Sequence, residues 1–76
     1  MHNSEKQYKE VLGERIRATR EAQGLSQDQL AYMIGGTSNG ANISRIELGK
    51  TGIQLETLHR IAKALGVTMC DLLEGF

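Results

Sequence analysis

The placement of glycine is the feature that most constrains how this chain can fold. The 76 residues include nine glycines and no proline. Gly24, Gly35–Gly36, Gly49 and Gly66 each follow a short stretch in which apolar residues recur with the helical period. Glycine is common just past the end of a helix, because it adopts the left-handed conformation easily. The pattern therefore predicts an all-α fold of short helices, with no strand.

Five helices are expected, forming one compact bundle. Their predicted ranges are 6–22, 26–34, 39–48, 55–65 and 68–73. Ser26 with Gln29, and Thr68 with Asp71, have the spacing of a capping box at a helix start. The fourth helix carries an apolar stripe that is expected to face the core, made of Leu55, Leu58, Ile61, Ala62 and Leu65. We expect residues 1–7 to be a flexible N-terminal segment and residues 8–76 to form the domain.

Composition excludes several classes of protein. Nine basic and nine acidic residues give a formal net charge of zero, so bulk charge offers no argument for a nucleic-acid partner. The single cysteine, Cys70, rules out an internal disulfide framework and a cysteine-rich zinc site. No apolar run is long enough to span a membrane, and the polar start does not look like a signal peptide. We expect a cytoplasmic binding module, with no metal, no cofactor and no enzyme activity.

The third predicted helix has two chemically different faces. At 3.6 residues per turn, Ile43, Ile46 and Glu47 share one face. The remaining positions offer a small residue, an amide, a hydroxyl and an arginine, contributed by Ala41, Asn42, Ser44 and Arg45. These groups can read base edges in DNA: arginine binds guanine, asparagine binds adenine, and a small apolar group contacts the thymine methyl. The alternative is an ordinary solvent-exposed polar face.

Glu47 is unusual because it lies on the apolar face of its helix. A buried carboxylate needs a cationic partner. Arg20 lies at the edge of the apolar stripe of the first helix, so we expect an Arg20–Glu47 ion pair that ties the first helix to the third. The alternative is a half-exposed Glu47 that contributes little.

Residues 12–73 resemble the lambda-repressor-like, Cro/C1-type helix-turn-helix domain, also called the XRE family. The resemblance is carried by five ordered blocks, which are residues 12–17 with Arg20, residues 24–27, Leu30–Ala31, residues 43–50, and residues 55–58 continuing through 61–67. The resemblance implies a five-helix DNA-binding domain that acts as a dimer on near-palindromic operators.

The resemblance also implies roles for single residues. It places Gln27, Lys50 and Thr51 on backbone phosphates. It places the base-reading positions at Gly40, Ala41, Asn42 and Arg45, with Ser44 as a neighbour. It assigns a structural arginine–glutamate pair to Arg20 and Glu47, in agreement with the helical geometry.

Three departures from the family pattern affect the site. The turn over residues 35–42 is two residues longer than is usual, so Thr37, Ser38 and Asn39 are expected either to cap the recognition helix or to contact DNA phosphates. Gly40 brings no side chain to a reading position. After Lys50, Gly52-Ile53 stands where the family often has Asn-Pro, which predicts a looser loop.

Local charge favours a dimer. From residue 14 to residue 50 the basic residues are Arg15, Arg17, Arg20, Arg45 and Lys50, and the acidic residues are Glu14, Glu21, Asp28 and Glu47. If Arg20 and Glu47 neutralise each other, little net positive charge remains to bind phosphates. Two subunits on half-sites one helical turn apart would recover the affinity.

The sequence therefore predicts a bacterial or phage regulator that binds double-stranded DNA, most simply as a homodimeric repressor that occludes a promoter or contacts RNA polymerase. One alternative is the antitoxin of a toxin–antitoxin pair, with a cognate toxin as partner. Another is a restriction-modification controller protein.

Four C-terminal apolar residues, Met69, Leu72, Leu73 and Phe76, are expected either to form a dimer seam or to pack onto the fourth helix.

Overall fold

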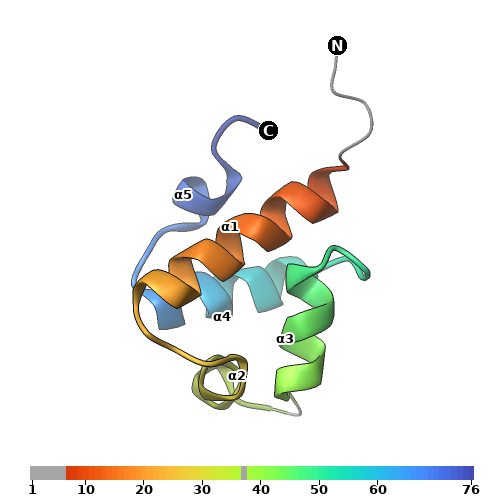
Figure 1. Ribbon diagram of the computed structural model, residues 1–76. Coiled ribbons are helices and arrows are strands. Elements are labelled where there is room, and N and C mark those ends of the chain that lie inside the picture. Colours follow the sequence, from red (N-terminus) through yellow and green to blue (C-terminus); the bar gives the residue numbers. More distant parts are fainter. Residues whose placement is uncertain (1–6, 37) are drawn as a thin grey trace.

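The computed structural model describes residues 7–36 and 38–76, and within these ranges it contains five helices and no strand. The helices are α1 (Tyr8–Ala22), α2 (Gln27–Ile34), α3 (Gly40–Glu47), α4 (Leu55–Leu65) and α5 (Met69–Leu73) (Figure 1). The predicted all-α five-helix bundle is confirmed. The predicted start of the first helix at Lys6 lies outside the described residues, and α1 begins at Tyr8.

Two predicted capping boxes form as expected. The Ser26 hydroxyl accepts a hydrogen bond from the Gln29 backbone N–H at 3.0 Å, and the Ser26 N–H donates to Gln29 Oε1 at 2.7 Å. Thr68 and Asp71 make the same reciprocal pair, with both distances 3.0 Å. Each box satisfies backbone N–H groups that the first turn of a helix leaves without a partner. These local bonds define the starts of α2 and α5.

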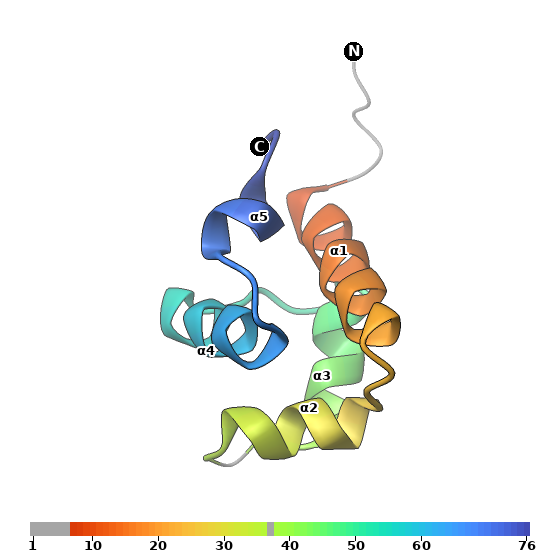
Figure 2. The same ribbon diagram turned by 90° about the vertical axis from the view of Figure 1, so that its left-hand side faces the viewer.

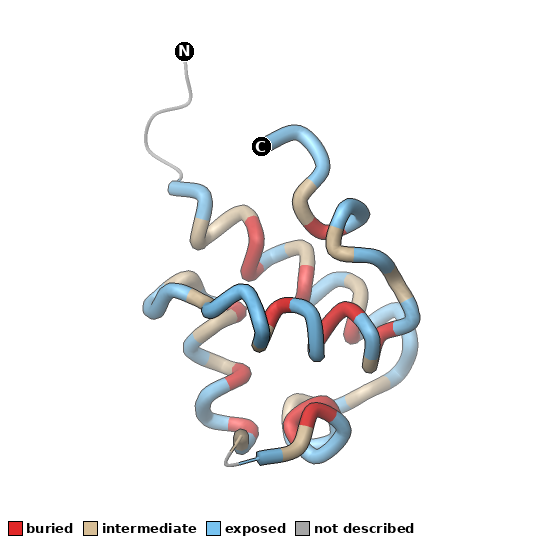
Figure 3. The backbone as a smooth tube through the Cα atoms, turned by 180° about the vertical axis from the view of Figure 1, so that it is seen from behind, coloured by how far each residue is buried: buried red, intermediate tan, exposed pale blue. Residues whose placement is uncertain are grey.

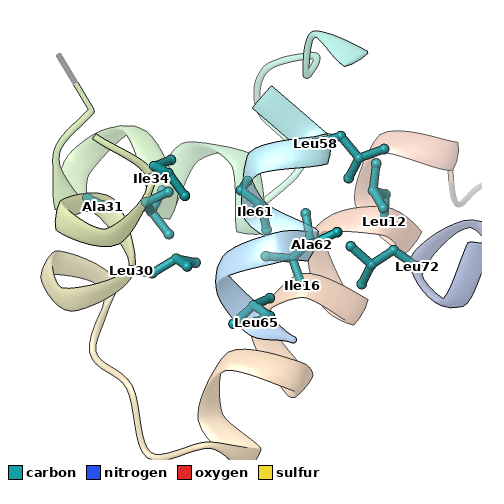
Figure 4. Close-up of a cluster of buried hydrophobic side chains, with 11 residues drawn as sticks. Leu12, Ile16, Leu30, Ala31, Ile34, Leu58, Ile61, Ala62, Leu65 and Leu72 are labelled. Carbon is teal, nitrogen blue, oxygen red and sulfur yellow. The ribbon is translucent and has the colours of Figure 1, made fainter. Parts of the chain in front are cut away.

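All five helices contribute side chains to the core, and Figure 4 shows those of α1, α2, α4 and α5 meeting there. Its buried members are Leu12, Ile16, Leu30, Ala31, Ile34, Ile43, Leu58, Ile61, Ala62, Leu65 and Leu72. The buried positions of α4 alternate with exposed ones at the helical period (Figure 3). The expectation for Leu55 is wrong: this residue is 70% exposed, because the first turn of α4 extends past the neighbouring helices (Figure 2).

Helix α5 closes the bundle by packing against α1 and α4. Leu72 is buried, and Met69 and Leu73 pack against the core, so packing accounts for three of the four C-terminal apolar residues. Arg15 of α1 donates hydrogen bonds to the backbone oxygens of Leu72, at 3.1 Å, and of Glu74. Its guanidinium also lies 4.8 Å from the centre of the Phe76 ring. The dimer seam expected as one alternative for this region stays a prediction.

Candidate nucleic-acid interface

Helices α2 and α3 pack against each other. The turn that joins them is the one that the family resemblance makes two residues longer than usual. In Figure 1, α3 lies below α1 and α5 lies on the upper side of α1, so α3 and α5 occupy opposite sides of this helix. The N-cap of α3 is Asn39, whose Oδ1 accepts a hydrogen bond from the Asn42 backbone N–H at 2.9 Å. Thr37 lies outside the described residues, and Ser38 is half-buried before the cap. The helix predicted over residues 39–48 is confirmed, with Asn39 and Leu48 as its caps.

The two faces of α3 are oriented as the helical period predicts. Ile43 is 1% exposed and Glu47 is 4% exposed, so this face is turned into the protein. Ala41, Asn42 and Arg45 are exposed, and Ser44 is half-buried. The side chains of Asn42 and Arg45 make no hydrogen bond or ion pair with any residue that the structure describes. Their donors and acceptors are therefore available to an external partner.

The predicted Arg20–Glu47 ion pair, on the buried face of α3, is confirmed. The Arg20 Nε–H donates to Glu47 Oε2 at 2.6 Å, and an N–H on Nη2 donates to Glu47 Oε1 at 3.1 Å. This fork-like geometry is the strong form of an arginine–carboxylate pair. The hydrogen bonds to Glu47 raise the pKa of Arg20 above its usual value, although burial lowers it. Arg20 also donates to the backbone oxygen of Leu25 at 2.6 Å, which ties the α1–α2 connection to the same pair.

Gln27, the first residue of α2, joins this buried pair. Its Nε2 donates to Glu47 Oε1 at 3.0 Å, and the residue is half-buried. The family resemblance places Gln27 on a phosphate and gives no sign of the contact with Glu47. The contact uses one amide N–H and leaves the other N–H and the carbonyl oxygen available. Spacing along one helix could not reveal it, because the two residues lie 20 positions apart on different helices.

A groove lies beside α3, with a volume of about 350 Å³. Its polar lining includes four predicted site residues, which are Ser38 from the turn, Asn42 and Arg45 from α3, and Thr51 from the following loop. The structure thus brings together residues from three consecutive segments. Lys50 is exposed next to Thr51, outside the groove lining.

Gly40 is the exception among the predicted base-reading residues. It is buried, and a Cβ added to it would collide with the carboxylate of Asp28. The absence of a side chain at Gly40 therefore allows α3 to pack closely against α2, and Gly40 has no side chain to offer to an external partner. The space that a side chain at position 40 would fill is taken by the Asp28 carboxylate, so a base-reading role for Gly40 stays a prediction.

Comparison with known proteins identifies this arrangement. A family model described as Helix-turn-helix matches residues 16–72. The chain belongs to the XRE-type helix-turn-helix family. It is similar to the SPbeta prophage-derived uncharacterized HTH-type transcriptional regulator YonR of Bacillus subtilis, with 35% identity over 65 residues, covering 86% of this chain and 58% of that protein. The chain spans about half the length of the curated relatives it matches.

Two solved structures share the fold and a substantial part of the sequence. The P22 c2 repressor, crystallised in complex with synthetic operator 9T, aligns with a TM-score of 0.75 and 35% identity, over 86% of this chain and 96% of that one. The restriction-modification controller protein C.AhdI from Aeromonas hydrophila aligns with a TM-score of 0.78 and 30% identity, over 83% of this chain and 92% of that one.

Charge on this helix-turn-helix domain is distributed differently from the sequence-based count. Arg15 is directed to the end of α5, on the side of the molecule away from α3. Arg17 forms an ion pair with Glu21 at 3.1 Å. Of the five basic residues counted between positions 14 and 50, Arg45 and Lys50 therefore remain as exposed cations without a described ion pair. The charge of Arg15, which the count included, therefore lies beside α5 and not beside α3.

Two further observations concern residues 7–36 and 38–76, the part of the chain that the structure describes. No group of three His, Cys, Asp or Glu side chains among these residues is arranged to hold a metal ion. Within the same residues, no helix has the length and hydropathy of a membrane span.

Proposed function

We propose that this helix-turn-helix domain binds double-stranded DNA sequence-specifically, with α3 in the major groove, and that it acts as a homodimeric transcriptional repressor on a near-palindromic operator. One observation carries the proposal: α3 exposes Asn42 and Arg45 without described internal partners, while Glu47 on its opposite face is held by Arg20. An α-helix fits the major groove, where each base pair presents a distinct pattern of donors and acceptors.

The exposed groups on α3 have defined base preferences. The Arg45 guanidinium can donate two hydrogen bonds to O6 and N7 of guanine, and the Asn42 amide can pair with N6 and N7 of adenine. Ala41 is small enough to contact a thymine methyl, and the Ser44 hydroxyl can bind either class of base. These four residues form the proposed base-reading set.

A second group of residues is proposed to hold the DNA backbone. Gln27, Ser38, Lys50 and Thr51 flank α3 and offer amide, hydroxyl or ammonium donors to phosphates. Thr37 remains in this set by prediction alone. The Asn39 side chain already accepts the capping hydrogen bond, so its contribution is the position of the α3 start.

The repressor and homodimer parts of the proposal rest on physical argument and on similarity. With Arg45 and Lys50 as the exposed cations near α3, one subunit neutralises few phosphates, and two linked subunits multiply their affinities. The likeness to the P22 c2 repressor, whose structure was solved with an operator, supports binding to DNA through the same fold.

Selection of duplexes from a random pool tests this function. We expect a consensus with two-fold symmetry and one dimer bound to each duplex. Arg45→Ala should lose discrimination between the selected operator and a scrambled duplex, at about 1–3 kcal/mol per contact. Lys50→Ala should weaken both duplexes alike, since phosphates carry no sequence information.

The matched control for charge is Lys63→Ala. Lys63 is exposed on α4 and makes no described ion pair, so its removal should leave the affinity for DNA nearly unchanged. Equal affinity of the unmodified protein for operator and scrambled duplex would refute sequence-specific binding.

A second candidate, a restriction-modification controller protein, is favoured by the likeness to C.AhdI. It involves the same DNA-binding face. A methyltransferase or endonuclease gene beside this one, with the selected site in their shared promoter, would favour it over a general repressor.

A further inference from the structure

The buried ion pair reaches the proposed DNA interface through one side chain. Arg20 donates two hydrogen bonds to the Glu47 carboxylate, and Gln27 donates a third to the same group. The Glu47 side chain is 1% exposed, whereas Gln27 is half-buried at the start of α2. Gln27 therefore connects the interior of the protein with the surface that flanks α3.

The chemistry of Glu47 determines which way the Gln27 amide points. An ionised carboxylate only accepts hydrogen bonds, and an amide offers donors on its nitrogen alone. Glu47 therefore holds the Gln27 nitrogen inward at 3.0 Å, and the amide plane has one orientation instead of two. The second N–H of the nitrogen stays available, in a direction that the bond to Glu47 restricts.

We propose that Glu47 is a positioning residue for DNA binding, which presents the free N–H of Gln27 to a backbone phosphate in a preorganised direction. The inference rests on the proposed function, and it adds a role for the ion pair beyond holding α1 to α3. An immobilised donor loses less conformational freedom when it binds than a mobile one does. Arg20 takes part indirectly, because it fixes the carboxylate that fixes the amide.

A double-mutant cycle separates positioning from stability. The variant Arg20→Met/Glu47→Leu removes one positive and one negative charge, so the net charge is unchanged, and apolar replacement of a buried ion pair is often neutral for stability. In the unmodified protein, Gln27→Ala should reduce affinity for DNA about tenfold, close to the lower end of what one hydrogen bond to a charged group contributes. In the Met/Leu background, the same substitution should reduce it less than about twofold, since the donor is then no longer held in place.

Both fold-changes are measured on two duplexes, the operator selected by the unmodified protein and its scrambled version, below the unfolding temperature of each variant. Because a phosphate contact is independent of sequence, the effect should be equal on both. Lys50→Ala is the control: Lys50 is exposed and makes no described contact with the ion pair, so its effect should be the same in both backgrounds.

Should the Met/Leu protein not fold, Glu47→Gln replaces it. The introduced glutamine has one acceptor oxygen for the three N–H groups that the carboxylate holds, so Gln27 competes with the charged Arg20 donors for it and the orientation of the Gln27 amide is loosened. An equal loss on Gln27→Ala in all backgrounds would overturn the inference while leaving DNA binding intact. If the unmodified protein shows no preference for the selected operator, the proposed function itself fails, which is a separate result.

Discussion

At the scale of single residues, Glu47 is the most informative position. Its charge in an apolar stripe predicts a partner, and the structure shows two, Arg20 and Gln27. The first could be predicted because a buried carboxylate requires a cation and α1 offers one at the edge of its apolar stripe. The second could not, because a neutral glutamine satisfies its amide equally well in water.

The Arg20–Glu47 pair should dominate the response to mutation. Glu47→Ala leaves a buried guanidinium without its partner and should lower the free energy of unfolding by about 3–5 kcal/mol. Arg20→Met/Glu47→Leu should restore most of this loss, because neither charge then remains buried. Urea denaturation of the unmodified protein, Glu47→Ala and Arg20→Met/Glu47→Leu measures these free energies of unfolding. A Glu47→Ala protein as stable as the unmodified one would contradict the energetic role of the pair.

Asp28 should limit the affinity for DNA. Its carboxylate lies against Gly40 at the start of α3, is exposed, and makes no ion pair with a described residue. A negative charge beside the proposed interface repels phosphates, so Asp28→Asn should tighten binding to any duplex and steepen its salt dependence. Glu74→Gln, the same charge change after α5, should have little effect in the same titration. Unchanged binding by Asp28→Asn would place this carboxylate away from the DNA.

At the scale of elements, the start of α3 depends on one cap. The turn offers Thr37, Ser38 and Asn39 as candidates, and side-chain chemistry alone does not choose among them, since all three types cap helices well. Asn39 becomes the cap because α3 begins where Gly40 can pack against Asp28. Packing between α2 and α3 thereby determines where the proposed recognition helix begins.

Two substitutions at position 39 separate capping from binding. Asn39→Ala should lower the free energy of unfolding by about 1 kcal/mol, because the Asn42 N–H loses its acceptor. Asn39→Asp keeps an acceptor and should retain stability, but its charge should weaken DNA binding. Thermal unfolding and DNA titration of both variants provide the measurement. Equal stability of all three proteins would show that the cap contributes nothing.

At the scale of the whole molecule, the neutral net charge and the small number of exposed cations near α3 limit how much bulk electrostatic attraction can contribute to DNA binding. Arg15, Arg17 and Arg20 are all engaged within the protein, in three different ways. Binding must then depend on specific hydrogen bonds and on the number of subunits more than on bulk attraction.

The salt dependence should therefore be shallow. If Arg45 and Lys50 each neutralise one phosphate, the slope of log K against log salt should be about −2 for one subunit and about −4 for a dimer. Titrations at several salt concentrations, with sedimentation of the complex, measure both quantities. A slope of about −10 would mean that many more cations contact DNA than Arg45 and Lys50 provide.

The amino-acid sequence by itself determined the helices, their glycine ends, two capping boxes and the inward face of α3. These features depend on residues three or four positions apart, and such neighbours are set by the helical period. Leu55 shows the limit of that reasoning. The helical period places it in the apolar stripe of α4, but whether a residue of that stripe is buried depends on how far the neighbouring helices extend, and Leu55 is exposed.

The tertiary structure alone decided the contacts between distant segments. It directed Arg15 to α5, joined Gln27 to Glu47, and gave the space beside Gly40 to Asp28. Each contact depends on how closely two helices approach and at what angle, which follows from the packing of the whole core. A side chain that can bond equally well to water or to protein carries no signal of its partner until that packing is known.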